Sequence, residues 1–343
     1  MKKYTGIWLL LVLFSQASAI KLNYSLEGFG EKASGYTDYH IQFPTTVLIT
    51  DGYTIDTSFS TGHSVLAFPL GGYRGGIKGS LFTLSKGKKN IRYGLELEIS
   101  KTLTQPSEAM VDSDWVVVPE LTYYLDRFIF GATESEAKLS DYDVSAAASI
   151  KRDLSQNMVR TVTGGYQFKR YQYDIYGISG WYDMDLDGIH EPVLSYYYQG
   201  VNVLDYMVTY NILNLGTNVE LMSNEGLKLF VGGTWFPYVS ASDLDDHLLR
   251  YKTAESDCRG SGYSLKAKGS VKLNVSSLAK GSNVYLGVSY CITRITAAGT
   301  QVQKYYADDP GTAEVETGLT FGGIDNTISL KQNTIAVSLE YQF

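Results

Sequence analysis

The chain has 343 residues, of which 44% are hydrophobic, 13% aromatic and 19% charged, and its formal net charge at pH 7 is −7. Its many aromatic and β-branched residues exclude a disordered chain, and two Cys without a glycine period exclude a disulfide scaffold and a collagen-like protein. A globular soluble protein and a membrane barrel remain. The acidic balance argues against nucleic acid as a partner, because backbone phosphates are bound by clustered Lys and Arg, and it suits cationic partners.

The N-terminus has the three parts of an export signal. Two lysines precede an apolar run over residues 7–14, and the small residues Ala17 and Ala19 follow it. This order is typical of a secretory signal peptide, and the apolar run is too short to cross a bilayer as a helix. We therefore expect residues 1–19 to be a signal peptide and residues 20–343 to form the mature chain, whose net charge moves from −7 to −9 with the two lysines removed.

Most of the mature chain alternates between apolar and polar residues. In one segment the apolar residues alternate with Lys266, Lys268 and Lys272. In another they alternate with Glu96 and Glu98. Successive side chains of a strand point to opposite faces, so each segment has one apolar and one charged face. A soluble sheet with its apolar face buried against a second sheet has the same pattern, but charges of both signs suit the polar interior of a barrel whose outer face meets lipid.

Segments of this kind predict one all-β domain, a ten-stranded antiparallel transmembrane β-barrel. An even strand number is typical of bacterial outer-membrane barrels, and ten strands make a narrow barrel whose interior side chains largely fill. Abundant Tyr suits the aromatic girdles at the two membrane interfaces. The expected strands are residues 22–43, 65–85, 91–104, 136–154, 157–180, 197–222, 226–242, 260–276, 282–298 and 328–343.

The first acidic motif follows the third expected strand. Asp112 and Asp114 are two residues apart, so on an extended segment both project from one face. Two carboxylates on one face repel each other and tend to share a proton, which leaves one of them able to hold a water molecule. The apolar stretch Val116–Phe130 comes next, and we expect it to extend a strand or to pack as a loop over the barrel mouth.

A second acidic motif lies between the fifth and sixth expected strands. Asp183, Asp185 and Asp187, followed by Gly188, have the spacing of a calcium loop, in which alternate oxygens face one ion and the glycine permits the turn. The twelfth position is Leu194 instead of the bidentate Glu that such loops use. A calcium site and a solvated acidic loop are both compatible with this sequence.

The third motif contains the one histidine with suggestive neighbours. Asp245 and His247 are two residues apart and follow the strand expected to end near residue 242. A carboxylate beside an imidazole orients the ring and raises its basicity, as a general base requires. Alone, the motif also suits a solvated loop or a cation site. We expect this motif and the Asp112–Asp114 motif on the same extracellular rim, a layout typical of a hydrolase that activates water.

The two cysteines leave two alternatives open. In an exported protein Cys258 and Cys291 lie in an oxidising compartment, where they can form a disulfide. Two buried free thiols are the alternative. The distance between their Cα atoms decides the matter.

Together, these features resemble the omptin family of outer-membrane proteases. The resemblance is carried by the signal peptide, the ten strands, the runs V-D-S-D-W at 111–115 and D-L-D-D-H at 243–247, and the terminal Phe343. It covers essentially the whole mature barrel. It implies a bacterial outer-membrane location with an active site that faces the exterior. Shorter matches are Ser34-Gly35, Gly165-Tyr166-Gln167 and Arg170.

The resemblance also implies a mechanism. Asp245 and His247 would form a catalytic dyad opposite the pair Asp112 and Asp114, with a water molecule held between them. His247 would take a proton from this water as it attacks a peptide carbonyl, without an acyl-enzyme and without a cofactor for the chemistry. The substrates would be peptides or proteins with basic side chains near the cleaved bond.

Two departures from the family pattern affect substrate and lipid binding. The family binds basic side chains with two acids, of which Asp243 matches one, while Tyr39 stands where the other is expected, with Asp38 next to it. Either the alignment slips by one residue or the pocket is less acidic. Tyr166 and Arg170 match positions that bind lipopolysaccharide, an activator in this family, but Phe168 replaces an expected acid. An interfacial Tyr and a snorkelling Arg are the alternative interpretation of that pair.

A non-enzymatic function is the main alternative. The same barrel scaffold serves adhesins and passages for small solutes, and fold alone does not choose among functions. The intact Asp–His spacing favours the peptidase, and the missing pocket acid favours either a binding protein or an enzyme with altered specificity.

Overall fold

The computed structural model describes residues 22–50, 55–83, 90–118, 127–183, 190–193, 198–223, 226–275, 282–309 and 315–343. The expected signal peptide lies outside these ranges, as do Asp185 and Asp187 of the calcium motif. Within the described ranges, no helix has the length and apolar character needed to cross a membrane.

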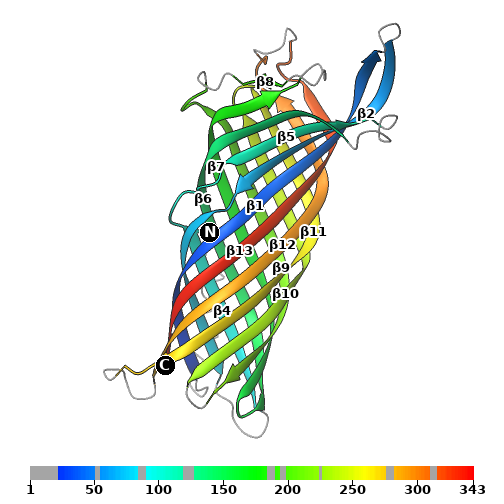
Figure 1. The fold of residues 1–343 in the computed structure, drawn as a ribbon. Helices are drawn as coiled ribbons and strands as arrows, with labels where there is room; N and C mark the ends of the chain where they lie inside the picture. The colour runs from blue at the N-terminus through cyan, green and yellow to red at the C-terminus, as the bar shows by residue number, and fades with distance from the viewer. Residues whose placement is uncertain are drawn as a thin grey trace, which may run out of the picture.

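The described residues form thirteen strands in one antiparallel sheet that closes into a barrel (Figure 1). From β1 the sheet runs through β13, β12, β11, β10, β9 and β7 to β6. The strands are β1 (Leu22–Thr50), β2 (Ile55–Pro69), β3 (Gly72–Thr83), β4 (Ile91–Thr102), β5 (Met110–Val117), β6 (Phe128–Ser155), β7 (Met158–Tyr182), β8 (Glu191–Pro192), β9 (Asn202–Met222), β10 (Leu227–His247), β11 (Lys252–Leu273), β12 (Asn283–Tyr305) and β13 (Thr320–Gln342).

Two positions of the ring are occupied by interrupted strands. β3 pairs with the lower part of β1, from Leu22 to Ala33, and β2 pairs with its upper part, from Tyr36 to Thr50. β4 and β5 pair in the same way with the lower and upper parts of β6. β8 is a two-residue strand that pairs with the end of β7. The ring therefore has ten strand positions, and the prediction of a ten-stranded antiparallel barrel is confirmed.

Several strands extend further towards the rim than the sequence predicted. β10 ends at His247 instead of residue 242, and β6 begins at Phe128 instead of residue 136. The apolar face changes sides along the barrel: on β13 the outward Val337 and Leu339 are apolar in the lower part, whereas the inward Ile328 and Leu330 are apolar near the rim. A single alternation pattern breaks at this change, so the predicted strands stopped short.

The segment Val116–Phe130 is partly explained by this extension. Val116 pairs with Phe128, so the two ends of the segment continue β5 and β6 towards the rim. Residues 119–126 between them lie outside the described residues.

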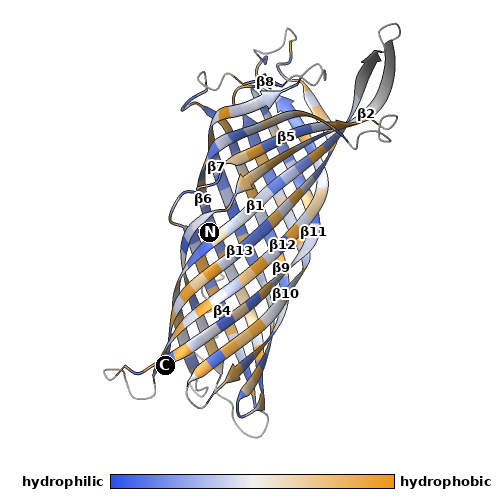
Figure 2. Ribbon diagram, viewed as in Figure 1, coloured by the Kyte–Doolittle hydropathy of each residue, from blue (hydrophilic) through white to orange (hydrophobic). Residues whose placement is uncertain are grey.

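An apolar band surrounds the lower part of the barrel. Leu97 on β4, Val231 on β10 and Val288 on β12 are among the outward side chains that are more than half exposed. Figure 2 shows apolar residues recurring along these lower strands. Exposed apolar side chains in this number are stable only against lipid. Aromatic residues border the band, below at Tyr24, Tyr93 and Phe343 and above at Tyr142, Tyr166, Tyr238, Tyr263 and Tyr290.

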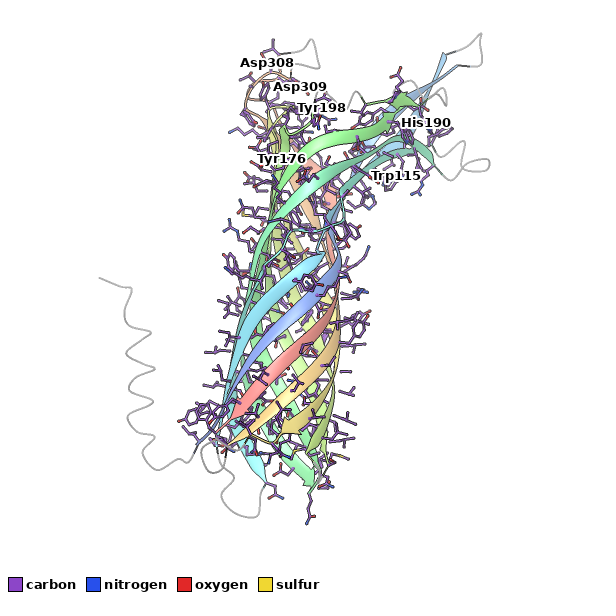
Figure 3. The ribbon with its side chains drawn as sticks, turned by 60° about the vertical axis from the view of Figure 1, so that its left-hand side comes forward. Trp115, Tyr176, His190, Tyr198, Asp308 and Asp309 are labelled. Carbon is purple, nitrogen blue, oxygen red and sulfur yellow. The ribbon has the colours of Figure 1, made fainter. Side chains whose placement is uncertain are left out.

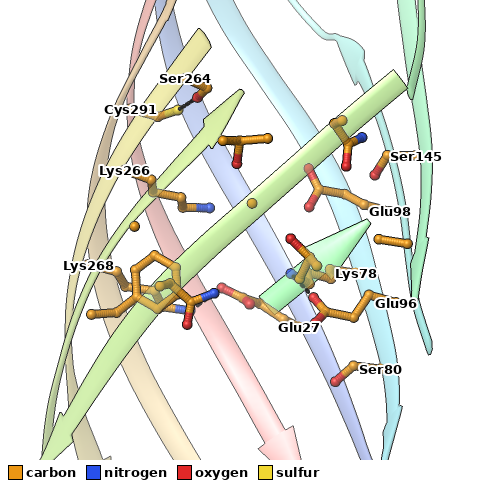
Figure 4. Close-up of a pocket in the computed structure, with 18 of the residues that line it drawn as sticks. Glu27, Lys78, Ser80, Glu96, Glu98, Ser145, Ser264, Lys266, Lys268 and Cys291 are labelled. Carbon is orange, nitrogen blue, oxygen red and sulfur yellow. Dashed lines mark hydrogen bonds and ion pairs between the residues drawn. The ribbon is translucent and has the colours of Figure 1, made fainter. Parts of the chain in front are cut away.

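Ion pairs fill the interior of the membrane-spanning part. Lys268 Nζ lies 2.5 Å from Glu27 Oε1, and Lys78 Nζ lies 2.6 Å from Glu96 Oε2. These side chains, with Glu98 and Lys266, line an internal cavity of about 370 Å³ (Figure 4). The charged faces of the strands therefore point inward and are neutralised by opposite charges, as the alternation predicted.

Above these ion pairs, an aromatic layer crosses the barrel interior. It consists of four fully or almost fully buried rings from four strands, and the rings of Phe68 and Tyr206 stack at 3.9 Å. The layer belongs to the main hydrophobic core and separates the charged lower cavity from the rim. Its members are Tyr39 on β1, Phe68 on β2, Tyr173 on β7 and Tyr206 on β9.

The two cysteines are free thiols that lie far apart. Cys291 is opposite Lys266 on β11, eight residues along that strand from Cys258. At about 3.3 Å per residue, this separation is roughly 26 Å, well beyond the Cα distance that a disulfide allows. Of the two alternatives, the structure therefore supports free thiols.

Candidate active site

The catalytic residues expected from the sequence lie on strands at the rim end of the barrel, opposite the end that holds the C-terminus (Figure 1). Because side chains alternate along a strand, Asp245 and His247 on β10 point inward together, and so do Asp112 and Asp114 on β5. The expectation that both pairs follow strand ends is wrong, since the strands include them.

His247 and Asp245 form a hydrogen-bonded pair. The Nε2 atom of His247 lies 3.0 Å from Oδ2 of Asp245. The carboxylate is completely buried, whereas the imidazole side chain is 22% exposed. A neutral imidazole that donates its Nε2–H to the carboxylate keeps Nδ1 as a proton acceptor. The dyad thus has one ring nitrogen anchored inside the barrel and the other available to a bound molecule.

The opposing acid pair carries raised pKa values. Burial and then the charge of Asp114 raise the pKa of Asp112, and the charge of Asp245 adds to this effect. Burial likewise raises the pKa of Asp114. Hydrogen bonds from Ser64 and the positive charge of Arg250 oppose both shifts. At neutral pH such a pair is best occupied by one shared proton, so it contains both a donor and an acceptor.

The two pairs act on each other across the barrel mouth. Asp245 contributes to the raised pKa of Asp112, and His247 acts on the pKa of Asp114 in the opposite direction. The structure therefore brings together two pairs of residues that are separated from each other by more than 120 positions in the chain. An imidazole base opposite a proton-sharing acid pair can polarise a water molecule from two sides.

Asp243 lies one inward position below the dyad and is only 6% exposed. The hydroxyl of Tyr206 donates to its Oδ2 at 3.4 Å. Burial, partly offset by a hydrogen bond from Ser256, raises the pKa of Asp243 to about 7. Its Oδ1 atom is buried without a hydrogen-bond partner among the described residues.

Four further residues take part in the site, and of these the sequence had singled out only Tyr39, as a departure from the family pattern. Tyr39 donates its hydroxyl to Asp245, and Ser64 on β2 bonds the acid pair. Lys252 pairs with His247 across β10 and β11, and burial lowers its pKa. The charge of Arg250 acts on both Asp112 and Asp114. Only strand pairing and closure of the barrel bring these residues to the motifs.

The expected lipopolysaccharide residues lie on the outer face of β7. Tyr166 is 42% exposed and donates its hydroxyl to Asn211 on β9. Arg170 is the next outward residue after Phe168 on β7, towards the rim. The ring of Phe168 stacks on that of Tyr142 at a centroid distance of 5.5 Å. Aromatic rings and a guanidinium thus adjoin at the upper edge of the apolar band, the level of lipid headgroups.

Asp183 is the one aspartate of the calcium motif within the described residues, and it is buried at the end of β7, where its backbone N–H donates to Phe130. Among the described residues, no three His, Cys, Asp or Glu side chains cluster in a way that could hold a metal ion.

Outside the site, the rim carries aromatic and acidic side chains. Figure 3 shows Trp115 and His190 on the part of the rim that projects sideways, and Asp308 and Asp309 elsewhere on the rim. The ring of His190 stacks on Trp181 at 3.6 Å, and Trp115 stacks on His63 at 5.1 Å.

Comparisons with known proteins agree with this architecture. The outer membrane protease OmpT from Escherichia coli is similar over 93% of this chain and 97% of its own, with 16% identity and a TM-score of 0.57. The translocator domain of the autotransporter NalP from Neisseria meningitidis covers 98% of this chain and 95% of its own at 11% identity, but with a TM-score of 0.32. No match was found among curated proteins. The model of the Omptin family matches residues 88–343, a range that holds the Asp112–Asp114 pair and the Asp245–His247 dyad. The chain belongs to that family.

Proposed function

We propose that this outer-membrane protein is an endopeptidase that hydrolyses peptide bonds with a water molecule activated by Asp245 and His247. The observation that carries the proposal is the convergence of this dyad and the Asp112–Asp114 pair at one mouth of the barrel. Family membership supports the protease class.

The geometry suggests how each group would act. Asp245 anchors Nε2 of His247, so Nδ1 accepts a proton from the water as its oxygen bonds to the peptide carbonyl carbon. The acid pair holds the water on the other side, and its shared proton is available to hydrogen-bond the developing oxyanion. The C–N bond then breaks, and the imidazolium returns its proton to the leaving amine.

Acidic side chains at the mouth support peptides with basic side chains as substrates. The carboxyl group of Asp243 lies below the dyad, and the mature chain as a whole is acidic. A cationic peptide is attracted by such a field before it binds.

We further propose lipopolysaccharide as an activator that binds the outer face around Tyr166 and Arg170. A guanidinium on the outer face beside aromatic rings at headgroup level suits a phosphorylated lipid. Activity that does not depend on added lipopolysaccharide, or that Arg170→Gln leaves equally responsive to it, would contradict this part of the proposal.

Hydrolysis of a mixed peptide library by the refolded protein, with lipopolysaccharide, tests the proposed activity. We expect cleavage by the wild type and a loss of about 10²–10⁴-fold in kcat/KM for His247→Ala, the range that general-base catalysis contributes. His63→Ala is the matched control, because His63 lies on the outer face of β2 and bonds His40 at 3.0 Å. Cleavage that survives in His247→Ala would refute the dyad.

The non-enzymatic alternative is distinguished by the same experiment. No cleavage by a correctly folded wild type would favour a binding role. Solute passage is disfavoured by the aromatic layer, whose buried rings close the interior between the mouth and the lower cavity.

A further inference from the structure

Tyr39 connects the far side of the barrel to the catalytic dyad. It points inward from β1, is 1% exposed, and donates its hydroxyl to Oδ2 of Asp245. The same oxygen lies 3.0 Å from Nε2 of His247. One carboxylate oxygen therefore binds two donors, one from β1 and one from β10.

The ring of Tyr39 is held in place from several sides. It packs against Tyr206 at 5.5 Å and Phe68 at 6.2 Å, and these two rings stack on each other. Its backbone is paired on both edges, with Leu66 on β2 and Ile328 on β13. A donor fixed by packing and by the sheet holds its acceptor with little freedom.

The environment of the phenol favours its protonated form. Burial, followed by the charge of Asp245 and the hydrogen bond to it, raises the pKa of Tyr39 well above its ordinary value. The hydroxyl therefore remains a donor. The second oxygen of Asp245, Oδ1, is buried without a hydrogen-bond partner among the described residues, so Tyr39 and His247 hold this carboxylate through Oδ2.

We propose that Tyr39 is a positioning residue, which holds the carboxylate of Asp245 in the orientation that His247 requires and thus makes a Tyr39–Asp245–His247 unit. This inference rests on the proposed peptidase function. It also gives a role to the tyrosine that occupies the position where the family pattern has an acid.

Loss of the hydroxyl alone should impair catalysis and not binding. In Tyr39→Phe the ring still packs in the aromatic layer, but the carboxylate of Asp245 can rotate and the imidazole loses its fixed orientation. We expect kcat to fall about 10- to 100-fold, the effect of removing one hydrogen bond to a charged group, with KM unchanged.

Tyr173→Phe is the matched control. Tyr173 belongs to the same aromatic layer and is equally buried, but its hydroxyl donates to the backbone oxygen of Pro69 at 3.0 Å and not to the dyad. We expect this variant to keep the wild-type kcat. Equal losses in both variants would show that Tyr39 acts through packing, and would overturn the proposal.

A double-mutant cycle separates coupling to Asp245 from general effects. In an Asp245→Asn background, Tyr39→Phe should cause little further loss of kcat, because the carboxylate that it positions is already gone. An undiminished loss in that background contradicts the proposal. If the wild type cleaves peptides and Tyr39→Phe cleaves them equally well, the positioning role fails while the proposed function stands.

An NMR titration of the His247 imidazole tests the unit without relying on activity. Without the Tyr39 hydroxyl, the negative charge of Asp245 is less dispersed, so we expect the titration midpoint to be higher in Tyr39→Phe than in the wild type. The ring also faces Asp114 on β5 and Lys252 on β11, and these groups are the same in both proteins. An unchanged midpoint would overturn the proposal even if the wild type proves inactive as a peptidase.

Discussion

At the scale of single residues, Asp112 illustrates how a site is assembled at the expense of stability. Its carboxylate is brought close to those of Asp114 and Asp245, and burial raises its pKa first of all. The folded protein therefore binds a proton at Asp112 more tightly than the unfolded chain does. Functional sites often contain such unfavourable groups, because the same perturbation serves the chemistry.

We predict that Asp112→Asn stabilises the protein at alkaline pH. The pKa of Asp112 is higher in the folded protein than in the unfolded chain. The free energy of unfolding of the wild type therefore falls as the pH rises from the ordinary carboxyl range to the pKa of the folded state, and it stays reduced at higher pH. Asn does not ionise. Urea unfolding should therefore show an advantage of Asp112→Asn at pH 9 that disappears near pH 4.

Asp257→Asn is the control for that comparison, because Asp257 is exposed on the outer face of β11. Its unfolding midpoint should follow that of the wild type at both pH values. An Asp112→Asn advantage that is the same at pH 4 and pH 9 would exclude ionisation as the cause.

Asp243 leads to a prediction about specificity. Burial first, and then Asp245, raise its pKa to about 7 against the hydrogen bonds from Ser256 and Tyr206. Its negative charge therefore develops between about pH 6 and 8. The ratio of kcat/KM for an Arg-containing peptide to that for a norleucine analogue should rise over this range.

Asp243→Asn should remove the pH dependence of this ratio, since the side chain no longer ionises. A ratio that is constant from pH 6 to 8 in the wild type would mean that Asp243 does not contact the basic side chain. Because both peptides meet the same dyad, the ratio cancels the titration of the catalytic groups.

At the scale of elements, β1 contains a point at which its pairing partner changes, and this point lies between the lower and upper parts of the barrel. β1 continues through the point where its partner changes from β3 to β2, and Gly35 lies at this point with a φ of +111°. A Cβ atom there would lie 1.9 Å from the backbone oxygen of Lys331. The backbone oxygen of Gly35 also accepts from the N–H of Leu70 at 2.9 Å, which joins β1 to the connection between β2 and β3.

We predict that Gly35→Ala destabilises the barrel by about 1–3 kcal/mol or more, because about 1–3 kcal/mol is the cost of a strained backbone conformation. Gly30→Ala on the same strand is the control, because no atom lies within 4 Å of its added Cβ. Guanidinium unfolding in detergent measures both. If the two variants unfold alike, the left-handed conformation of Gly35 is not a constraint.

At the scale of the whole molecule, the barrel has two parts with opposite surfaces. The lower part is apolar outside and filled with ion pairs, and the upper part is polar outside and filled with the aromatic layer. The lower part meets lipid, while the upper part carries the acidic pairs at a mouth that water and peptides reach. The boundary between the parts is marked by the upper ring of exposed tyrosines.

We predict that Val288→Lys destabilises the folded barrel in lipid by about 2–4 kcal/mol, the cost of a Lys on the lipid-facing side near the bilayer midplane. Thr296→Lys is the matched control on the same strand, exposed on the same outward face but eight residues nearer the rim. Unfolding in bilayers should separate the two variants. Equal stability would mean that the apolar band does not contact the hydrocarbon core.

The sequence by itself determined the class of fold, the number of strand positions in the barrel, and the two candidate pairs, Asp112 with Asp114 and Asp245 with His247. Alternation is a local property, since neighbouring side chains of a strand point to opposite faces, and it identified the lower parts of β11, β12 and β13 but not their ends at the rim. The spacing of Asp112 with Asp114, and of Asp245 with His247, is local in the same sense. It is therefore readable before the strands are paired.

Only the tertiary structure decided which residues from distant strands complete the site. Closure of the barrel brings Tyr39 of β1 to Asp245 of β10, and pairing of β2 with β5 brings Ser64 to the acid pair. It also decided that Cys258 and Cys291 remain apart, because that depends on the register of β11 with β12. Register and closure are relations between segments far apart in the chain, and no pattern within one segment contains them.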